Sequence, residues 1–140
     1  TLDQTPMTLE IEGGYLKKAT CENKQLEAEF WEYCHTAEGS DRVGEFAIGT
    51  NLAVFEFTGN LLQDEKMPGI HIAFGDPYGS QTGADWVCCT HVDVITGTCD
   101  VWIDDVLIME NGIFNANELG FDYSYLAEDP SVAPVLRRRG

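Results

Sequence analysis

The stretch Cys89-Thr90-His91-Val92-Asp93-Val94-Ile95 is the most informative part of this chain. Its β-branched residues predict a strand. In a strand, residues i and i+2 point to the same face, so the side chains of His91 and Asp93 stand side by side. A second strand-like run, Gly69-Ile70-His71-Ile72-Ala73-Phe74-Gly75, carries another of the three histidines. A metal site is therefore the leading functional hypothesis.

The composition predicts a single globular domain over residues 1–140 with an acidic surface. Hydrophobic residues make up 44% of the chain and aromatic residues 11%, which is enough for a core. The formal net charge of −16 argues against nucleic acid as a partner, because phosphates require a basic surface, and it equally disfavours an anionic membrane surface. A carboxylate-rich surface suits cations, including metals and amines.

The cysteines favour a reducing compartment. There are five of them, at positions 21, 34, 88, 89 and 99, and the set is scattered, odd in number and includes an adjacent pair. Such a set is a poor disulfide framework, so we expect free thiols in a cytoplasmic protein. No run of about 18 apolar residues and no signal-peptide pattern occurs, so the sequence predicts no membrane association.

The hydrophobic patterns predict an α+β fold that is predominantly β-strand, with one main amphipathic helix over about residues 23–36. Two alternating runs within residues 7–21 flank Gly13-Gly14, which predicts a hairpin. Later strands are predicted at residues 45–49, 53–58, 69–75, 86–95 and 98–103, followed by a hairpin through 101–109 and a turn at 110–112. The segments 59–69 and 76–85 are predicted to be loops.

Three further side chains join the His91–Asp93 pair as candidates. Glu45 begins an apolar strand, where a carboxylate facing a core is costly unless paired or metal-bound; its alternative is a strand-end residue in solvent. His71 lies between two isoleucines, and its alternative is a hydrogen-bonded core residue. Tyr78 follows in a turn, either as a donor to an oxyanion or as an ordinary half-buried tyrosine. For His91 and Asp93 the alternative is a hydrogen bond of structural value only.

Two histidines with carboxylates suit two kinds of chemistry. Hydrolytic zinc, cobalt or manganese sites use such ligands, and there the metal lowers the pKa of a bound water. The two-histidine, one-carboxylate set of non-haem Fe(II) oxygenases uses them as well. The residue types alone leave both alternatives open.

Four segments, taken in order, resemble the C-terminal half of the thermophilic-type metalloaminopeptidases, the aminopeptidase T and aminopeptidase S group. They are residues 42–51 (RVGEFAIGTN), 59–66 (GNLLQDEK), 71–78 (HIAFGDPY) and 90–93 (THVD). The likeness covers roughly residues 8–114. Each motif is short, and it is their joint order and spacing that make the resemblance specific.

The resemblance implies a metal-dependent aminopeptidase, a hydrolase that removes N-terminal residues from peptide substrates. At the matching positions, Glu45, His71, His91 and Asp93 would bind one or two divalent ions of zinc, cobalt or manganese. Tyr78 and Glu45 would take part in catalysis. The resemblance also reaches a ring-cleaving dioxygenase of the same fold, which uses the two histidines and the aspartate to hold Fe(II).

The chain departs from this family in two respects. It has no α/β N-terminal domain and begins at Thr1 without a methionine, and none of residues 1–44 corresponds to the family's additional metal-ligating glutamate. We therefore expect a C-terminal catalytic domain or fragment whose peptidase activity alone is weak or undetectable. A further hypothesis is a non-catalytic truncated metal-binding domain that forms a homodimer through its apolar surface.

Overall fold

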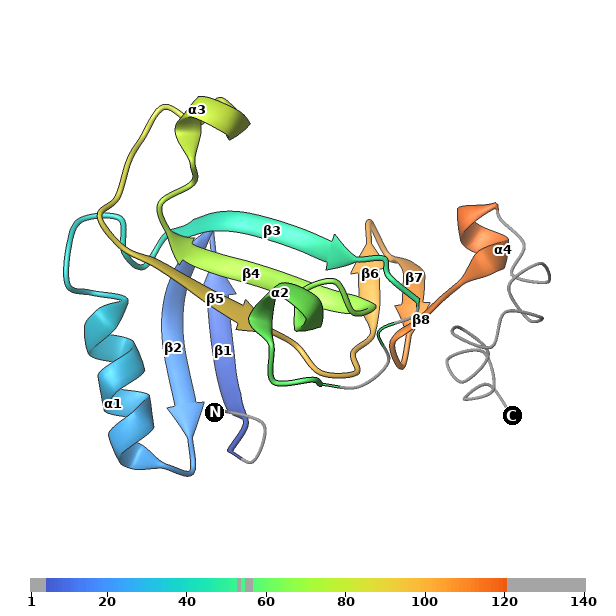
Figure 1. The fold of residues 1–140 in the computed structure, drawn as a ribbon, viewed down its shortest axis with the longest axis horizontal. Helices are drawn as coiled ribbons and strands as arrows, with labels where there is room; N and C mark the ends of the chain where they lie inside the picture. Colours follow the sequence, from blue (N-terminus) through green and yellow to red (C-terminus); the bar gives the residue numbers. More distant parts are fainter. Residues whose placement is uncertain (1–4, 53, 55–56, 121–140) are drawn as a thin grey trace. The chain divides into compact units, whose positions relative to one another are not determined.

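The computed structural model describes residues 5–52, 54 and 57–120 (Figure 1). In chain order the elements are β1 (Met7–Glu12), β2 (Tyr15–Cys21), α1 (Lys24–Tyr33), β3 (Val43–Gly49), α2 (Leu61–Asp64), β4 (Gly69–Gly75), α3 (Gly79–Thr82), β5 (His91–Ile95), β6 (Val101–Ile103), β7 (Val106–Glu110), β8 (Ile113–Phe114) and α4 (Ala116–Leu119). They belong to two compact units. Unit 1 comprises residues 1–46 and 72–94, and unit 2 comprises residues 47–71 and 95–140.

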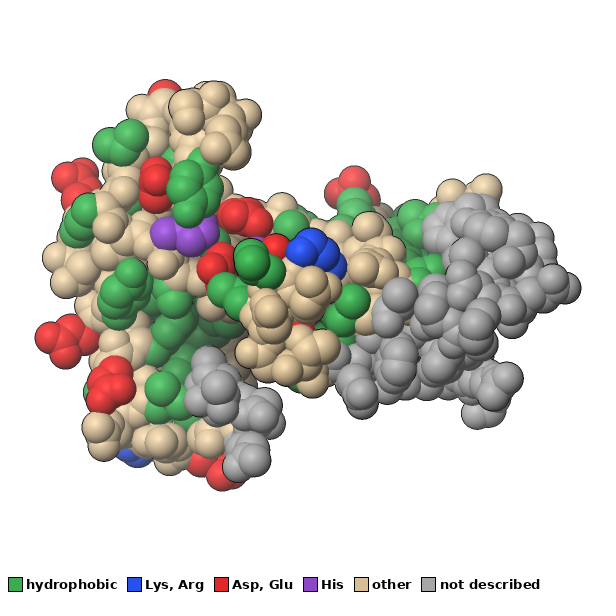
Figure 2. All heavy atoms as spheres, viewed as in Figure 1, with side chains coloured by type: hydrophobic (Ala, Val, Ile, Leu, Met, Phe, Trp, Pro, Cys, Tyr) green, Lys and Arg blue, Asp and Glu red, His purple; other side chains and the backbone are tan. Residues whose placement is uncertain are grey.

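The strands form three antiparallel sheets, of order β1-β2, β3-β4-β5 and β6-β7-β8. The boundary between the two units falls within the strands of the second sheet. Strand content exceeds helix content in the described residues, so the mostly-β character of the predicted α+β class is confirmed. In keeping with the net charge of −16, Figure 2 shows acidic side chains scattered over the visible face and few basic ones.

Unit 1 is built on the predicted hairpin. Glu12 pairs with Tyr15, and the two residues between them, Gly13 and Gly14, have φ of 60° and 80°. Positive φ at both central positions is the geometry of a type I′ turn, which glycine adopts without steric cost. The hairpin was predicted from the Gly-Gly pair, and the structure confirms it.

The core of unit 1 gathers Leu16 from β2, Cys34 from the end of α1 and Phe74 from β4. Phe30 of α1 meets Phe74 edge to face, with ring centroids 6.3 Å apart. Val92 and Val94 of β5 pack against the same cluster. Because side chains alternate along a strand, this packing turns the intervening odd-numbered residues of β5 away from the core.

The prediction of one main amphipathic helix over about residues 23–36 is not confirmed in that form. The helix α1 begins after Asn23, whose side chain accepts hydrogen bonds from the backbone of Gln25 and Leu26, as a helix N-cap does. However, none of its ten residues is fully buried, and three further helices of four residues each occur in the described chain. Two of these, α2 and α3, lie in segments that were predicted to be loops.

Unit 2 has its own core of Val101, Ile108, Met109 and Phe114. The predicted hairpin and its following turn are both present as β6-β7-β8. Both turns contain two residues with positive φ: 47° and 68° at the pair 104–105, and 50° and 73° at the pair 111–112. These are again type I′ connections, for which asparagine, aspartate and glycine are the preferred residues.

Three predicted strands differ from the structure. The segment predicted at 86–95 is a strand only over His91–Ile95, and that at 98–103 only over Val101–Ile103. Of the strand predicted at 53–58, residues 53, 55 and 56 lie outside the described residues, and positions 54, 57 and 58 are not in a strand. The segment after residue 120 also lies outside the described residues. Among the helices that are described, none is long and apolar enough to cross a membrane.

Candidate metal centre

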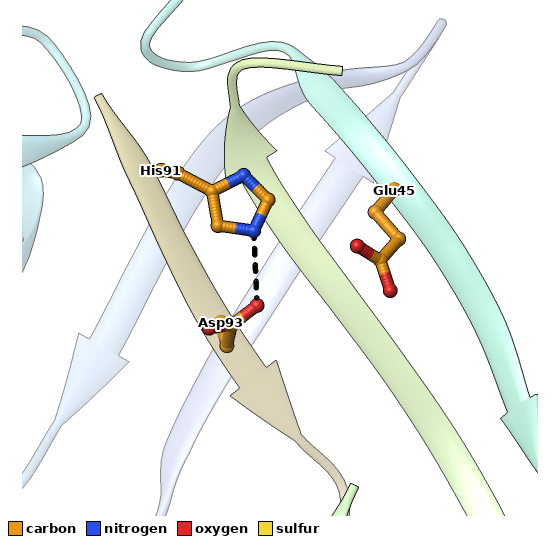
Figure 3. A group of neighbouring side chains, drawn as sticks. All are labelled: Glu45, His91 and Asp93. Atoms are coloured by element: carbon orange, nitrogen blue, oxygen red, sulfur yellow. Dashed lines mark hydrogen bonds and ion pairs between the residues drawn. The ribbon is translucent and has the colours of Figure 1, made fainter. Parts of the chain in front are cut away.

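Three of the residues singled out from the sequence come together in unit 1. One ligand atom each from Glu45, His91 and Asp93 lies within 4.8 Å of the others, and all three residues are partly buried. Glu45 is on β3, whereas His91 and Asp93 are on β5, and β4 runs between these strands (Figure 3). The i, i+2 spacing on β5 places the last two side chains on one face, as predicted. This group can hold a metal ion.

The imidazole of His91 is held from both sides. Its Nδ1 lies 2.9 Å from the backbone oxygen of Asp76, and its Nε2 lies 3.2 Å from Oδ1 of Asp93. A carbonyl oxygen can only accept, so Nδ1 carries the proton that it donates to Asp76. In the neutral imidazole, Nε2 is then a bare lone pair that faces a carboxylate.

This arrangement suits a cation. The lone pair of Nε2 and the carboxylates of Glu45 and Asp93 are all electron-pair donors, and they converge on one region. A metal ion bound here would lie between these donors. Metal-bound histidines commonly donate their other ring N–H to a carbonyl or carboxylate, which fixes the tautomer. The bond from Nδ1 to the Asp76 carbonyl matches that pattern.

Two glycines let the backbone segments of the site approach each other. A Cβ at Gly44, next to Glu45, would lie 2.3 Å from the backbone oxygen of Gly75. A Cβ at Gly75, next to Asp76, would lie 2.1 Å from the backbone oxygen of Thr90. The N–H of Asp76 also donates to that Thr90 oxygen at 2.7 Å. Close backbone contact therefore positions the carbonyl that orients His91.

We expect Gly75→Ala to lower the free energy of unfolding by about 2–5 kcal/mol, from backbone strain and from overpacking. Its φ of +103° is in the region that favours glycine, and the new methyl would meet backbone that cannot rotate away. Gly14→Ala is the matched control, since Gly14 has φ +80° and nothing within 4 Å of its would-be Cβ. It should cost about 1–2 kcal/mol. Equal losses for both variants in urea unfolding would contradict the steric argument.

Tyr78 lies against the histidine of this group. The two ring centroids are 4.7 Å apart with the ring planes tilted by 45°, and the tyrosine side of the pair is 47% exposed. Its backbone has φ 50° and ψ 53°, a left-handed conformation that is uncommon for a residue other than glycine. Such conformations are concentrated at functional sites. The sequence placed Tyr78 in a turn, and the structure adds the contact with His91.

His71 is not a member of the three-residue group. It is buried in β4 on the unit 2 side of the boundary, with 5% of its surface exposed. Its Nδ1 lies 4.0 Å from Oε2 of Glu65, the residue that follows α2. This contact was not predicted from the sequence, because the two residues are on different elements. The role of His71 as a metal ligand stays a prediction.

The five cysteines are free, as predicted. Burial, together with the charge of Asp41, raises the pKa of the Cys34 thiol to about 11. Cys88 differs. Burial opposes its ionisation, but hydrogen bonds from Thr90 and Ser40 outweigh burial, so the pKa of Cys88 is lower than usual for a cysteine.

Comparison of the chain with protein-family models, with curated proteins and with solved structures finds no match. The chemistry of the site is therefore the basis for assigning a function. That chemistry is one imidazole and two carboxylates in a partly buried position, with a tyrosine ring against the imidazole.

Proposed function

We propose that this chain is the metal-binding catalytic part of a metal-dependent aminopeptidase. The observation that carries the proposal is the convergence of Glu45, His91 and Asp93 within 4.8 Å, with His91 oriented by a backbone carbonyl. Nitrogen and oxygen ligands of this kind suit zinc, cobalt and manganese. The resemblance of residues 42–51, 71–78 and 90–93 to that enzyme family supports the same assignment.

The residues of the chain divide the work in this proposal. Glu45, His91 and Asp93, which all belong to unit 1, bind the divalent ion. The bound ion supplies Lewis acidity, which activates water and polarises a carbonyl at neutral pH. Glu45, the nearest carboxylate from a separate strand, takes up the proton that the attacking water releases. Tyr78 directs its hydroxyl toward the developing oxyanion.

Charge supports a substrate with a free amino terminus. The chain has 24 acidic residues against eight basic ones, so its surface attracts the α-ammonium group of a peptide. A cytoplasmic location fits the free thiols. The peptide would approach the side on which Tyr78 is exposed.

An iron oxygenase is the weaker alternative on the observed geometry. The non-haem Fe(II) site requires two histidines and one carboxylate. The group that comes together in the described residues has one histidine and two carboxylates, a set richer in hard oxygen donors. This balance favours a hydrolytic metal over Fe(II).

The test is metal binding followed by turnover. Calorimetric titration of metal-free protein with zinc, cobalt or manganese should show a specific site. Hydrolysis of an aminoacyl-anilide should follow metal loading and disappear with EDTA. Specific binding without turnover in any protein that contains these residues would favour the non-catalytic alternative. Iron after anaerobic purification would favour the oxygenase.

A further inference from the structure

Cys88 and Cys89 form an adjacent pair of free thiols just before the strand that carries His91. Cys88 is partly buried and Cys89 is exposed, and the chain bends at Cys89. The extended strand begins only at His91. The two cysteines therefore lie on a segment whose conformation is not fixed by sheet pairing.

The sulfur of Cys88 sits in a small polar cluster. It lies 3.2 Å from Oγ1 of Thr90 and 3.5 Å from Oγ of Ser40, and it donates to the backbone oxygen of Glu38 at 3.6 Å. The Thr90 hydroxyl in turn donates to Ser40 at 2.8 Å. Ser40 and Thr90 are 1% and 8% exposed, so two buried hydroxyls surround the thiol. Because the single Thr90 hydroxyl proton goes to Ser40, it is the Ser40 hydroxyl that can donate to a Cys88 thiolate, in agreement with the lowered pKa of Cys88.

We propose that Cys88 and Cys89 are a reversible thiol-modification site, in which a low-molecular-weight disulfide oxidises the pair to a Cys88–Cys89 disulfide. Redox-sensitive cysteines characteristically combine a thiolate with an accessible position and a neighbouring resolving cysteine. Cys88 supplies the thiolate and is itself partly exposed, and the exposed Cys89 is the neighbouring resolving cysteine. The buried Cys34, whose pKa is raised to about 11, has none of them.

The reaction is a double thiol–disulfide exchange. The Cys88 thiolate attacks one sulfur of the small disulfide, whose S–S bond breaks, and the departing thiolate takes up the proton that Cys88 gave up. The Cys89 sulfur then loses its proton and attacks Sγ of Cys88, and the second small thiol leaves with that proton. Together the protein thiols lose two electrons, and the small disulfide is reduced to two thiols.

Such a bond would be easy to reverse. Adjacent Cα atoms are about 3.8 Å apart, which is shorter than the usual separation across a disulfide of about 4.4–6.8 Å. A strained disulfide has a higher reduction potential than an unstrained structural one. A cellular thiol can therefore restore the reduced pair, which makes the modification a switch.

The switch acts on the metal centre, and this part rests on the proposed function. Bond formation withdraws the Cys88 sulfur from the hydroxyls of Thr90 and Ser40. Thr90 is the residue before His91, and its carbonyl accepts from Asp76, whose own carbonyl orients the imidazole. Because outer groups that orient a ligand typically change metal affinity 10–100-fold, we expect oxidation to weaken zinc binding by about 10-fold.

Mass spectrometry tests the thiol chemistry directly. Reduced, metal-free protein is incubated with oxidised glutathione, and intact masses and mapped peptides are followed with time. Wild type should lose two hydrogens at the Cys88–Cys89 peptide, whereas Cys89→Ser should retain one glutathione at Cys88. The rate of glutathione addition to Cys88→Ser should be at least about 10-fold lower than that of wild type, because the variant lacks the Cys88 thiolate. Cys99→Ser is the matched control and should behave as wild type, since Cys99 has no adjacent thiol.

Equal rates for Cys88→Ser and wild type would overturn the proposal, as would a wild-type protein that stops at the mixed disulfide. Zinc affinity is then compared before and after oxidation, and an unchanged Kd would overturn the coupling. Reduced Cys88→Ser keeps a hydrogen-bonding group beside Thr90 and Ser40, so it should bind zinc like wild type, which would show that the Cys88 thiol is not a ligand. Absence of zinc binding by reduced wild type would overturn the proposed function and the coupling, whereas the masses would still decide the thiol chemistry.

Discussion

Replacement of His91 by alanine is expected to weaken zinc binding about 10²–10³-fold and to abolish metal-dependent hydrolysis. Structural zinc sites bind with about 10–16 kcal/mol from four ligands, or about 2.5–4 kcal/mol for each, and a tenfold change in Kd corresponds to about 1.4 kcal/mol. His91 is the one imidazole of the group, and the hydrogen bond from its Nδ1 to the backbone oxygen of Asp76 fixes its orientation.

His35→Ala is the control for a lost histidine. His35 is exposed beyond the end of α1, stacked on Trp31 at 4.0 Å, and its Nδ1 contacts the backbone oxygen of that residue. The variant should bind zinc as wild type does. Asp93→Asn keeps the size of the side chain but removes its charge, and its Kd should fall between those of the other two proteins. Zinc binding or turnover that survives His91→Ala would rule out the proposed centre.

The parts of the fold that the sequence predicted well depend on local chemistry. The Gly13-Gly14 turn and the Asn111-Gly112 turn each need two residues with positive φ. Glycine and asparagine are the residues that favour positive φ, so the residue types predict both turns. Short helices such as α2 and α3 carry no such signal. Four residues are too few for a helical period to appear in the hydrophobic pattern.

The strand predicted over 86–95 shows where local propensity fails. Val87 is β-branched, yet its side chain is 82% exposed. The side chains of Cys88 and Thr90 form hydrogen bonds with the buried Ser40. Ser40 lies 48 residues before Cys88 and 50 residues before Thr90 in the sequence. Tertiary contacts thus replace sheet pairing in the first half of this segment. Strand propensity is a local property, so it does not predict such contacts.

The candidate site divides in the same way. The His91–Asp93 pair follows from the period of two along a strand, and the 3.2 Å contact between the two side chains bears this out. The approach of Glu45 depends on the pairing of β3 with β4, which strand periodicity alone does not specify. The Asp76 contribution was missed altogether, because a backbone carbonyl leaves no mark in the residue types. The glycine at position 75 was the one sequence feature that could have pointed to this carbonyl, because its lack of a side chain permits the close backbone contact with Thr90.

Tyr78→Phe is expected to lower the turnover of aminoacyl-anilide by about 10²-fold, the usual consequence of removing one donor to an oxyanion. The change should leave zinc affinity as it was, because the phenyl ring retains its contact with the His91 ring, 4.7 Å between centroids. Both quantities are measured on the same metal-loaded preparation of a protein that contains these residues. A fall in kcat at constant Kd for zinc separates a role in catalysis from a role in holding the histidine.

Tyr33→Phe provides the matched control for the loss of a phenol near the same histidine. The Tyr33 hydroxyl lies 3.5 Å from the backbone oxygen of His91, at the outer limit of a hydrogen bond, and its residue is 43% exposed. Its removal should leave turnover nearly unchanged, because it points to the backbone of His91 rather than to the ligand atoms. If both variants lost activity equally, the phenols would act by supporting β5. If neither did, Tyr78 would be an aromatic cover for the imidazole, and its left-handed backbone would serve packing instead of chemistry.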